Sequence, residues 1–211
     1  MDSIAARSGR RSVTQLMAGS VLVCALFGSQ PALAQETNGC PAGSYSVVIS
    51  PDGATLSILF DQFAVESGGA TALGQARKVC RISAPLKLGE NYSIGVYKVD
   101  YRGFAKLATK QNAQLDVQYF LGPHDSEHGR VFKRSIRGPH QDDYSFTETI
   151  GGGQMKRVGC GAAAVLNVDI TLGLDGDLRS GEAMASLDTS DGAPGGALIY
   201  HLKLVKCPGA R

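Results

Sequence analysis

The chain has 211 residues, of which 19% are charged, 7% are aromatic and none is tryptophan, and its formal net charge is +2. Three arginines and one aspartate fall within residues 1–34, so acidic and basic side chains are equal in number in residues 35–211. This balance argues against a nucleic-acid partner, because binding phosphates requires a clustered surplus of positive charge.

The first 34 residues have the order of a secretory signal peptide. A basic stretch at 7–11 precedes an apolar run at 16–27, and Ala32-Leu33-Ala34 offers small residues at a cleavage site before Gln35. The apolar run is too short and too interrupted for a transmembrane anchor. Cys24 lacks the small preceding residue that lipidation requires, and the basic stretch matches a twin-arginine signal poorly. We therefore expect a secreted or periplasmic protein whose single domain spans 35–211, a length sufficient for a sizeable core.

After residue 35, apolar and polar residues alternate with a period of two, and Gly, Pro, Asn and Asp interrupt the pattern. The pattern predicts strands near 45–50, 55–63, 80–86, 92–107, 113–121, 132–137, 144–150, 164–174, 181–188 and 198–204. Turn signals separate these strands, and 66–75 is expected to be a Gly- and Ala-rich mobile loop. No segment has a helical period, so we predict an all-β chain that forms one antiparallel β-sandwich.

Four cysteines remain after cleavage, namely Cys40, Cys80, Cys160 and Cys207. An even number of cysteines in an exported chain indicates disulfides. The pairing Cys40–Cys80 with Cys160–Cys207 is favoured, because each bridge would join segments that flank one sheet edge, and the other pairings stay open. A zinc site is disfavoured, because no pair has the short C-x₂₋₄-C spacing.

Two segments contain residue types that bind metals elsewhere. Residues 124–128 have the H-x-x-E-H pattern of inverted zinc proteases, but the flanking breakers leave no room for the helix that this site needs, so we expect a polar loop. Calcium could find oxygen ligands among the acidic side chains Asp175, Asp177, Glu182, Asp188 and Asp191. The EF-hand spacing is absent and turn chemistry explains the Asp-Gly pairs, so we expect no metal or other cofactor and leave calcium open.

Two further groups of side chains could bind a ligand. A basic stretch contains Arg130, Lys133, Arg134, Arg137 and His140. In a strand these charges divide between two faces, which favours a charged edge strand over an anion site. Aromatic side chains that could support a sugar ring in place of tryptophan are Tyr92, Tyr97, Tyr101 and Phe104, although alternation places several of them in the core.

No catalytic arrangement can be assigned from the sequence. The chain has no G-x-S-x-G motif, the cysteines are expected to be bridged, and scattered acids do not identify a carboxylate pair. We therefore predict that the protein is not an enzyme. Asn91-Tyr92-Ser93 is a glycosylation sequon that matters only in a eukaryotic source.

Several motifs together resemble one family. They are the run Asp-Tyr-Arg-Gly-Phe-Ala at 100–105, the spacing of the four cysteines, and the segments 38–44, 60–63, 77–80, 160–161, 188–192 and 206–207. Over about residues 38–207 the chain resembles the secreted family known as domain of unknown function 4360. The resemblance implies export, one domain and a disulfide framework, and it supplies no catalytic residues. One departure is Leu204-Val205-Lys206, where the family often has an aromatic residue.

The run at 100–105 also has a physical interpretation. Gly103 inside a strand indicates a bulge or a close backbone approach, and Arg102 could pair with Asp100 or with another nearby carboxylate.

We expect a non-enzymatic binding or structural module at the cell envelope, with a cell-wall glycan or an extracellular protein as partner. The first alternative is an inhibitor or effector that uses the loop at 124–128 or 192–196, and the second is a hydrolase. The ligand and the oligomeric state stay open.

Overall fold

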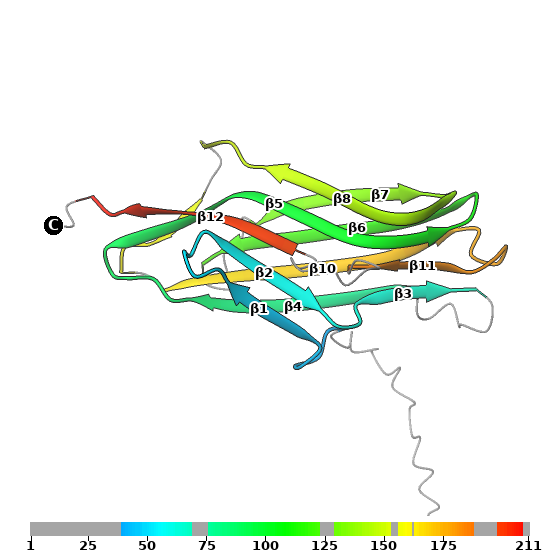
Figure 1. The fold of residues 1–211 in the computed structure, drawn as a ribbon, viewed down its shortest axis with the longest axis horizontal. Coiled ribbons are helices and arrows are strands. Elements are labelled where there is room, and N and C mark those ends of the chain that lie inside the picture. Colours follow the sequence, from blue (N-terminus) through cyan, green and yellow to red (C-terminus); the bar gives the residue numbers. More distant parts are fainter. Residues whose placement is uncertain are drawn as a thin grey trace, which may run out of the picture. The chain divides into compact units, whose positions relative to one another are not determined.

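The computed structural model describes residues 39–68, 76–122, 129–152, 156–161, 163–187 and 198–208 (Figure 1). The predicted signal peptide, the H-x-x-E-H segment, the loop at 192–196, and Asp188 and Asp191 lie outside the described residues. No helix in the described part is long and apolar enough to cross a membrane.

The described residues form strands only, in two antiparallel sheets, which confirms the predicted all-β fold. The strands are β1 (Tyr45–Ile49), β2 (Thr55–Phe60), β3 (Ala64–Ser67), β4 (Arg77–Leu86), β5 (Tyr92–Leu107), β6 (Gln111–Leu121), β7 (Arg130–Arg137), β8 (His140–Thr149), β9 (Arg157–Gly159), β10 (Ala164–Gly176), β11 (Ala183–Ser186) and β12 (Leu198–Lys206).

The long strand β5 organises the larger sheet. On one side, β5 pairs with β12 along its first part and with β11 along its last part. Strand β12 is followed outward by β2 and β1, and β11 is followed by β3. On its other side β5 pairs with β9 and β8. The smaller sheet has the order β4-β10-β6-β7. Every pair is antiparallel, and β5 has the bounds that the alternation predicts.

One hydrophobic core lies between the sheets. Alternate residues of β6 and β10 face it, because the period of a strand sends successive side chains to opposite faces. Rings from opposite sheets meet there. Tyr101 of β5 stacks on Phe132 of β7 with centroids 3.9 Å apart, and Tyr119 of β6 meets Tyr200 of β12 edge-on at 5.3 Å.

Some predicted boundaries are wrong. The predicted strand at 55–63 is too long, because β2 ends at Phe60 and β3 begins only at Ala64. The alternation signals this break, since the buried positions change from even at Phe60 to odd at Phe63. Glu66 and Ser67 belong to β3 and not to the predicted loop at 66–75. Strand β9 was not predicted, since three residues are too few for an alternation signal.

The structure pairs Cys40 with Cys80 and Cys160 with Cys207, as favoured from the sequence, with Cα atoms 5.2 Å and 5.7 Å apart. The first bridge joins the segment before β1 to the outer edge of β4, where Gly39 N–H also donates to the Val79 carbonyl. It therefore lies at a sheet edge, as expected, and ties the start of the larger sheet to the smaller one. The second joins the ends of β9 and β12, which lie on opposite sides of β5. Each bridge stabilises the fold by about 4 kcal/mol in the chain-entropy treatment of loops this long.

Gly103 is a close approach and not a bulge. A Cβ at this position would collide with the Ser186 carbonyl oxygen and with the Tyr144 hydroxyl. The Tyr144 side chain crosses the glycine and donates a 2.7 Å hydrogen bond to that carbonyl. The irregularity in β5 lies elsewhere, at Tyr97, which has no partner in β12 because His201 pairs with Lys98 and Leu202 with Val96.

Candidate functional site

Three strands of the larger sheet present two polar clusters, one on each face. Residues 98–101 of β5 lie between 198–201 of β12 and 146–149 of β8. Because successive side chains alternate between faces, each of these strands contributes one polar residue to the core side and the next to the outer side. We call the core-side cluster, together with the side chains of the smaller sheet that bind it, the inner network; it consists of Tyr101, Tyr119, Arg130 and Glu148. We call the outer cluster the Tyr97 face.

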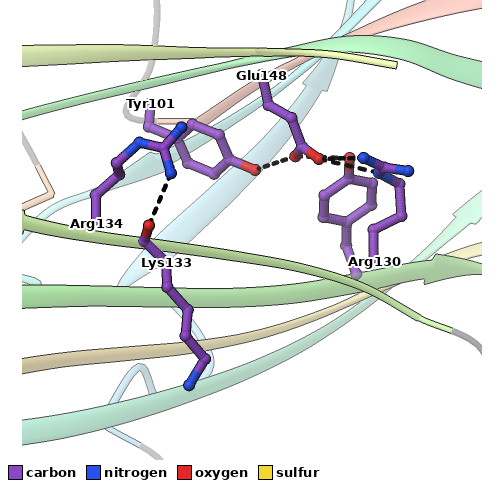
Figure 2. A network of polar contacts seen from close by, with 6 residues as sticks. Tyr101, Arg130, Lys133, Arg134 and Glu148 are labelled. Atoms are coloured by element: carbon purple, nitrogen blue, oxygen red, sulfur yellow. Dashed lines mark hydrogen bonds and ion pairs between the residues drawn. The ribbon is translucent and has the colours of Figure 1, made fainter. Parts of the chain in front are cut away.

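The inner network centres on the carboxylate of Glu148 (Figure 2). Its Oε2 accepts hydrogen bonds from the hydroxyls of Tyr101 at 3.2 Å and Tyr119 at 3.0 Å. Its Oε1 accepts from Nε and Nη2 of Arg130 at 2.9 Å and 2.7 Å. The Glu148 side chain is 12% exposed. One carboxylate therefore joins β5 and β8 of the larger sheet to β6 and β7 of the smaller sheet.

The tyrosines of the inner network stay protonated at neutral pH. Burial, together with the nearby Glu148 charge, raises the pKa of both Tyr101 and Tyr119. Burial likewise raises the pKa of Tyr200. The Tyr200 hydroxyl is fully buried and has no hydrogen-bond partner in the described part of the protein. Tyr101 and Tyr119 can thus act as stable donors to Glu148.

Strand β7 confirms that the predicted basic stretch is divided. Arg130 pairs with Glu148 on the core side, and Lys133 pairs with Asp116 at 3.2 Å on the other side. The Arg134 guanidinium lies over the Phe132 ring, with Cζ 4.4 Å from the centroid, and donates to the Lys133 carbonyl (Figure 2). These contacts leave no single basic patch on β7, so the stretch serves as a charged edge strand.

The Tyr97 face comprises Tyr97, Lys98, Asp100, Thr147 and His201. Asp100 is its central acceptor: Oδ2 accepts from His201 Nε2 at 2.7 Å and from Lys98 Nζ at 3.0 Å, and Oδ1 accepts from Thr147 Oγ1 at 2.7 Å. Arg102, for which Asp100 or another nearby carboxylate was considered as partner, is not among these contacts. Partial burial raises the pKa of Asp100, but the hydrogen bonds from Thr147, Lys98 and His201 outweigh burial and lower it overall.

Tyr97 supplies the aromatic part of this face. Its ring centroid lies 5.9 Å from that of His201, and the residue is 39% exposed. Its position as the extra residue of the strand explains the exposure, because an irregularity of this kind redirects a side chain. Of the other aromatic candidates, Tyr92 is 38% exposed at the far end of β5, Phe104 is half-buried and Tyr101 belongs to the core.

The Tyr97 face combines one ionised acceptor, several donors and an exposed ring. It contains no nucleophile aligned for acyl transfer, because the Thr147 hydroxyl donates to Asp100, and no hydroxyl or thiol of the described residues is hydrogen-bonded to His201. The described residues contain no group of three side chains that could hold a metal ion.

The acidic side chains for which calcium was left open do not converge, as far as the structure describes them. Asp175 accepts from Asn112 at 2.9 Å and from Gln114 at 2.6 Å on the outer face of the smaller sheet. Glu182 pairs with Lys106 at 3.5 Å. Beside Asp175, the missing side chain of Gly173 leaves a shallow hollow of about 170 Å³.

Sequence reasoning missed Glu148 and Tyr200. The signal for Glu148 was available, since Tyr144, Phe146 and Glu148 occupy alternate positions of one strand. A carboxylate on the apolar face of a strand indicates a buried partner. The sequence contains no comparable signal that the Tyr200 hydroxyl lacks a hydrogen-bond partner among the described residues, because that depends on how the two sheets pack.

Comparison with known proteins gives three findings. The profile of the family described as domain of unknown function 4360 matches residues 33–207. An uncharacterised secreted protein of Arthroderma benhamiae is 26% identical over 170 residues, which cover 80% of this chain and 67% of that protein. A cryo-EM structure of the extra small virus particle of the prawn Macrobrachium rosenbergii has a TM-score of 0.19 at 13% identity, with coverage of 64% of this chain and 82% of that chain. This TM-score is too low to indicate a shared fold.

Proposed function

This chain belongs to the family described as domain of unknown function 4360, and we propose that it is a secreted, non-enzymatic module that binds a glycan through the Tyr97 face. The observation that carries the proposal is the exposed Tyr97 ring beside the hydrogen-bonded pair of Asp100 and His201.

The chemistry of the Tyr97 face suits a sugar. A pyranose ring has an apolar C–H surface and a rim of hydroxyl groups that both donate and accept. The negative face of the Tyr97 ring attracts C–H groups. Asp100 can accept from a sugar hydroxyl, and Lys98 can donate to one. A planar ring beside a few fixed polar groups is the composition typical of small-ligand sites.

The inner network supports the face from behind. Glu148 is the neighbour of Thr147 in β8, and Tyr101 is the neighbour of Asp100 in β5. The hydrogen bonds of Glu148 to Tyr101, Tyr119 and Arg130 hold these strands against the smaller sheet. Polar groups on strands fixed in this way lose little freedom when a ligand binds, which favours affinity.

The same geometry favours binding over hydrolysis. Glycoside hydrolysis uses two carboxyl groups that flank one bond. Among the adjacent residues 98–101, 146–149 and 198–201, the two side-chain carboxyl groups are those of Asp100 and Glu148. They lie on opposite faces of the larger sheet. They cannot both reach one substrate.

The test is retention of the oxidised, exported protein on insoluble glycans: peptidoglycan, chitin, cellulose and walls of the source organism. We expect saturable retention that Tyr97→Ala weakens at least about tenfold, a loss of about 1.4 kcal/mol in binding free energy. Tyr92→Ala is the matched control, because Tyr92 is equally exposed on the same strand but lies away from the Tyr97 face. Absence of retention on every glycan, or equal effects of the two variants, would refute the proposal.

A further inference from the structure

The edge strands of the two sheets differ in how they are protected against pairing with another chain. An exposed edge has unpaired backbone groups, and proteins commonly protect it with charged side chains. Strand β7 has four basic residues, β8 has Asp142 and Asp143, β3 has Glu66, and β4 has Arg77 and Arg81. Strand β1, with the sequence YSVVI, has no charge, and it is the one edge strand of the described residues without any.

The backbone groups of β1 divide cleanly between its two sides. Ser50 N–H donates to Thr55 O at 3.0 Å and Asp61 N–H donates to Ser44 O at 3.1 Å, so the even-numbered residues of β1 form the hydrogen-bonded pairs with β2. The N–H and C=O groups of Tyr45, Val47 and Ile49 must then point away from β2, where no further strand of the described residues pairs with them.

The side chains of β1 are also exposed and apolar. Val48 is 51% exposed and Ile49 is 44% exposed, although both are large aliphatic residues. Figure 1 shows β1 at the margin of its sheet, beside β2. Neither charge, proline nor bulge within β1 opposes the approach of another strand.

We propose that β1 is a self-association edge, at which β1 of a second copy of this chain pairs in antiparallel orientation. The outward groups allow a two-fold symmetric register centred on Val47. Val47 faces Val47 of the partner subunit, and Tyr45 faces Ile49 of the partner subunit. In this register all three outward N–H groups and all three outward C=O groups of each copy are paired.

The occupant is a second copy because the strand is complementary to itself. The symmetric register places no like charges opposite one another, whereas β7 or β8 paired with its own copy would do so. It also places Val48 beside Ser46 of the partner subunit, which covers the most exposed apolar side chain of β1. The two larger sheets would then become one continuous sheet.

The first measurement is the mass of the protein in solution by sedimentation equilibrium, from about 1 to about 200 µM, since a reversible dimer dissociates on dilution. We expect a monomer–dimer equilibrium in which Val48→Lys raises the dissociation constant at least about tenfold. Val131→Lys is the matched control, because Val131 is as exposed on the charged edge strand β7 and should leave the equilibrium unchanged.

Amide hydrogen exchange tests the register. In the dimer the amides of Tyr45, Val47 and Ile49 should become protected as concentration rises, while those of Ser46 and Val48 are protected at every concentration by β2. A monomer throughout the range overturns the proposal, as does a dimer that Val48→Lys does not weaken. Protection of the odd-numbered amides in a monomer also overturns it, because another segment of the same chain would then cover β1.

Discussion

Replacing Glu148 with alanine removes the shared acceptor of the inner network. The hydroxyls of Tyr101 and Tyr119 lose their partner, and the Arg130 guanidinium loses two charge-assisted hydrogen bonds. Both tyrosines are nearly inaccessible to water, so their donors cannot be satisfied by solvent without rearrangement of the core.

The expected loss can be worked from these contacts. A buried donor left without an acceptor costs about 1–3 kcal/mol. Arg130 is one-third exposed and can turn to water, so its share of the loss is small. The free energy of unfolding should therefore fall by about 3 kcal/mol, with the midpoint of thermal unfolding lower by about 6–12 °C for a domain of this size.

Chemical denaturation of the oxidised protein measures this change, with Glu182→Ala as a matched control. Glu182 also pairs with a cation, at 3.5 Å from Lys106, but its side chain is 72% exposed, so its removal should cost about 0.5 kcal/mol or less. The double variant Glu148→Ala/Arg130→Ala should lose less stability than the two single variants together. A loss of less than about 0.5 kcal/mol for Glu148→Ala would show that the inner network does not join the sheets.

Two further predictions concern the core. Gly103→Ala should lower the free energy of unfolding by about 2–3 kcal/mol, because the new Cβ meets the Ser186 carbonyl and the Tyr144 hydroxyl. Gly173→Ala is the control; its Cβ has no such neighbour, so it should cost less than about 1 kcal/mol. Equal losses in urea denaturation would contradict this account of Gly103. The second prediction is alkaline unfolding, since burial raises the pKa of four tyrosines, Tyr101, Tyr119, Tyr144 and Tyr200. As pH rises, the unfolded chain loses these protons first, so stability is unaffected below about pH 10 and falls above it by up to about 1.4 kcal/mol per pH unit for each tyrosine. The free energy of unfolding measured from pH 8 to pH 11.5 should show this fall. Tyr200→Phe should make the fall less steep without weakening the protein at neutral pH, because the Tyr200 hydroxyl has no hydrogen-bond partner among the described residues. A free energy of unfolding that is independent of pH over this range would contradict burial of these hydroxyls.

Most strands could be predicted because each has one buried and one wet face. The strands β5, β6 and β10 have long runs of alternating residues, and their predicted and observed positions agree closely. The end of β2 was harder to predict, because Phe63 extends the apparent strand beyond Phe60 unless the change of parity between them is noticed.

The candidate site was less predictable, because it depends on which strands are neighbours. Alternation places His201 and Asp100 on wet faces, but it does not reveal that β12 and β5 are adjacent. The sequence therefore did not indicate that His201 pairs with Asp100. The disulfide pairing was favoured for a reason that holds for one bridge only. The Cys40–Cys80 bridge lies at the outer edge of β4, whereas the Cys160–Cys207 bridge joins the ends of strands on opposite sides of β5, and the sequence does not reveal which strands are neighbours.

The position of β12 has a consequence for how the protein is made. Strand β12 lies between β2 and β5, in the interior of the larger sheet, so the place of β2 at residues 55–60 depends on residues 198–206. A nascent chain cannot complete this sheet until residues 198–206 have been synthesised, and contacts so distant in sequence form slowly. The polypeptide thus remains incompletely folded during synthesis, the condition in which an export channel that threads extended chains can accept it. Final folding, and closure of the bridge at Cys207, would then take place on the far side of the membrane.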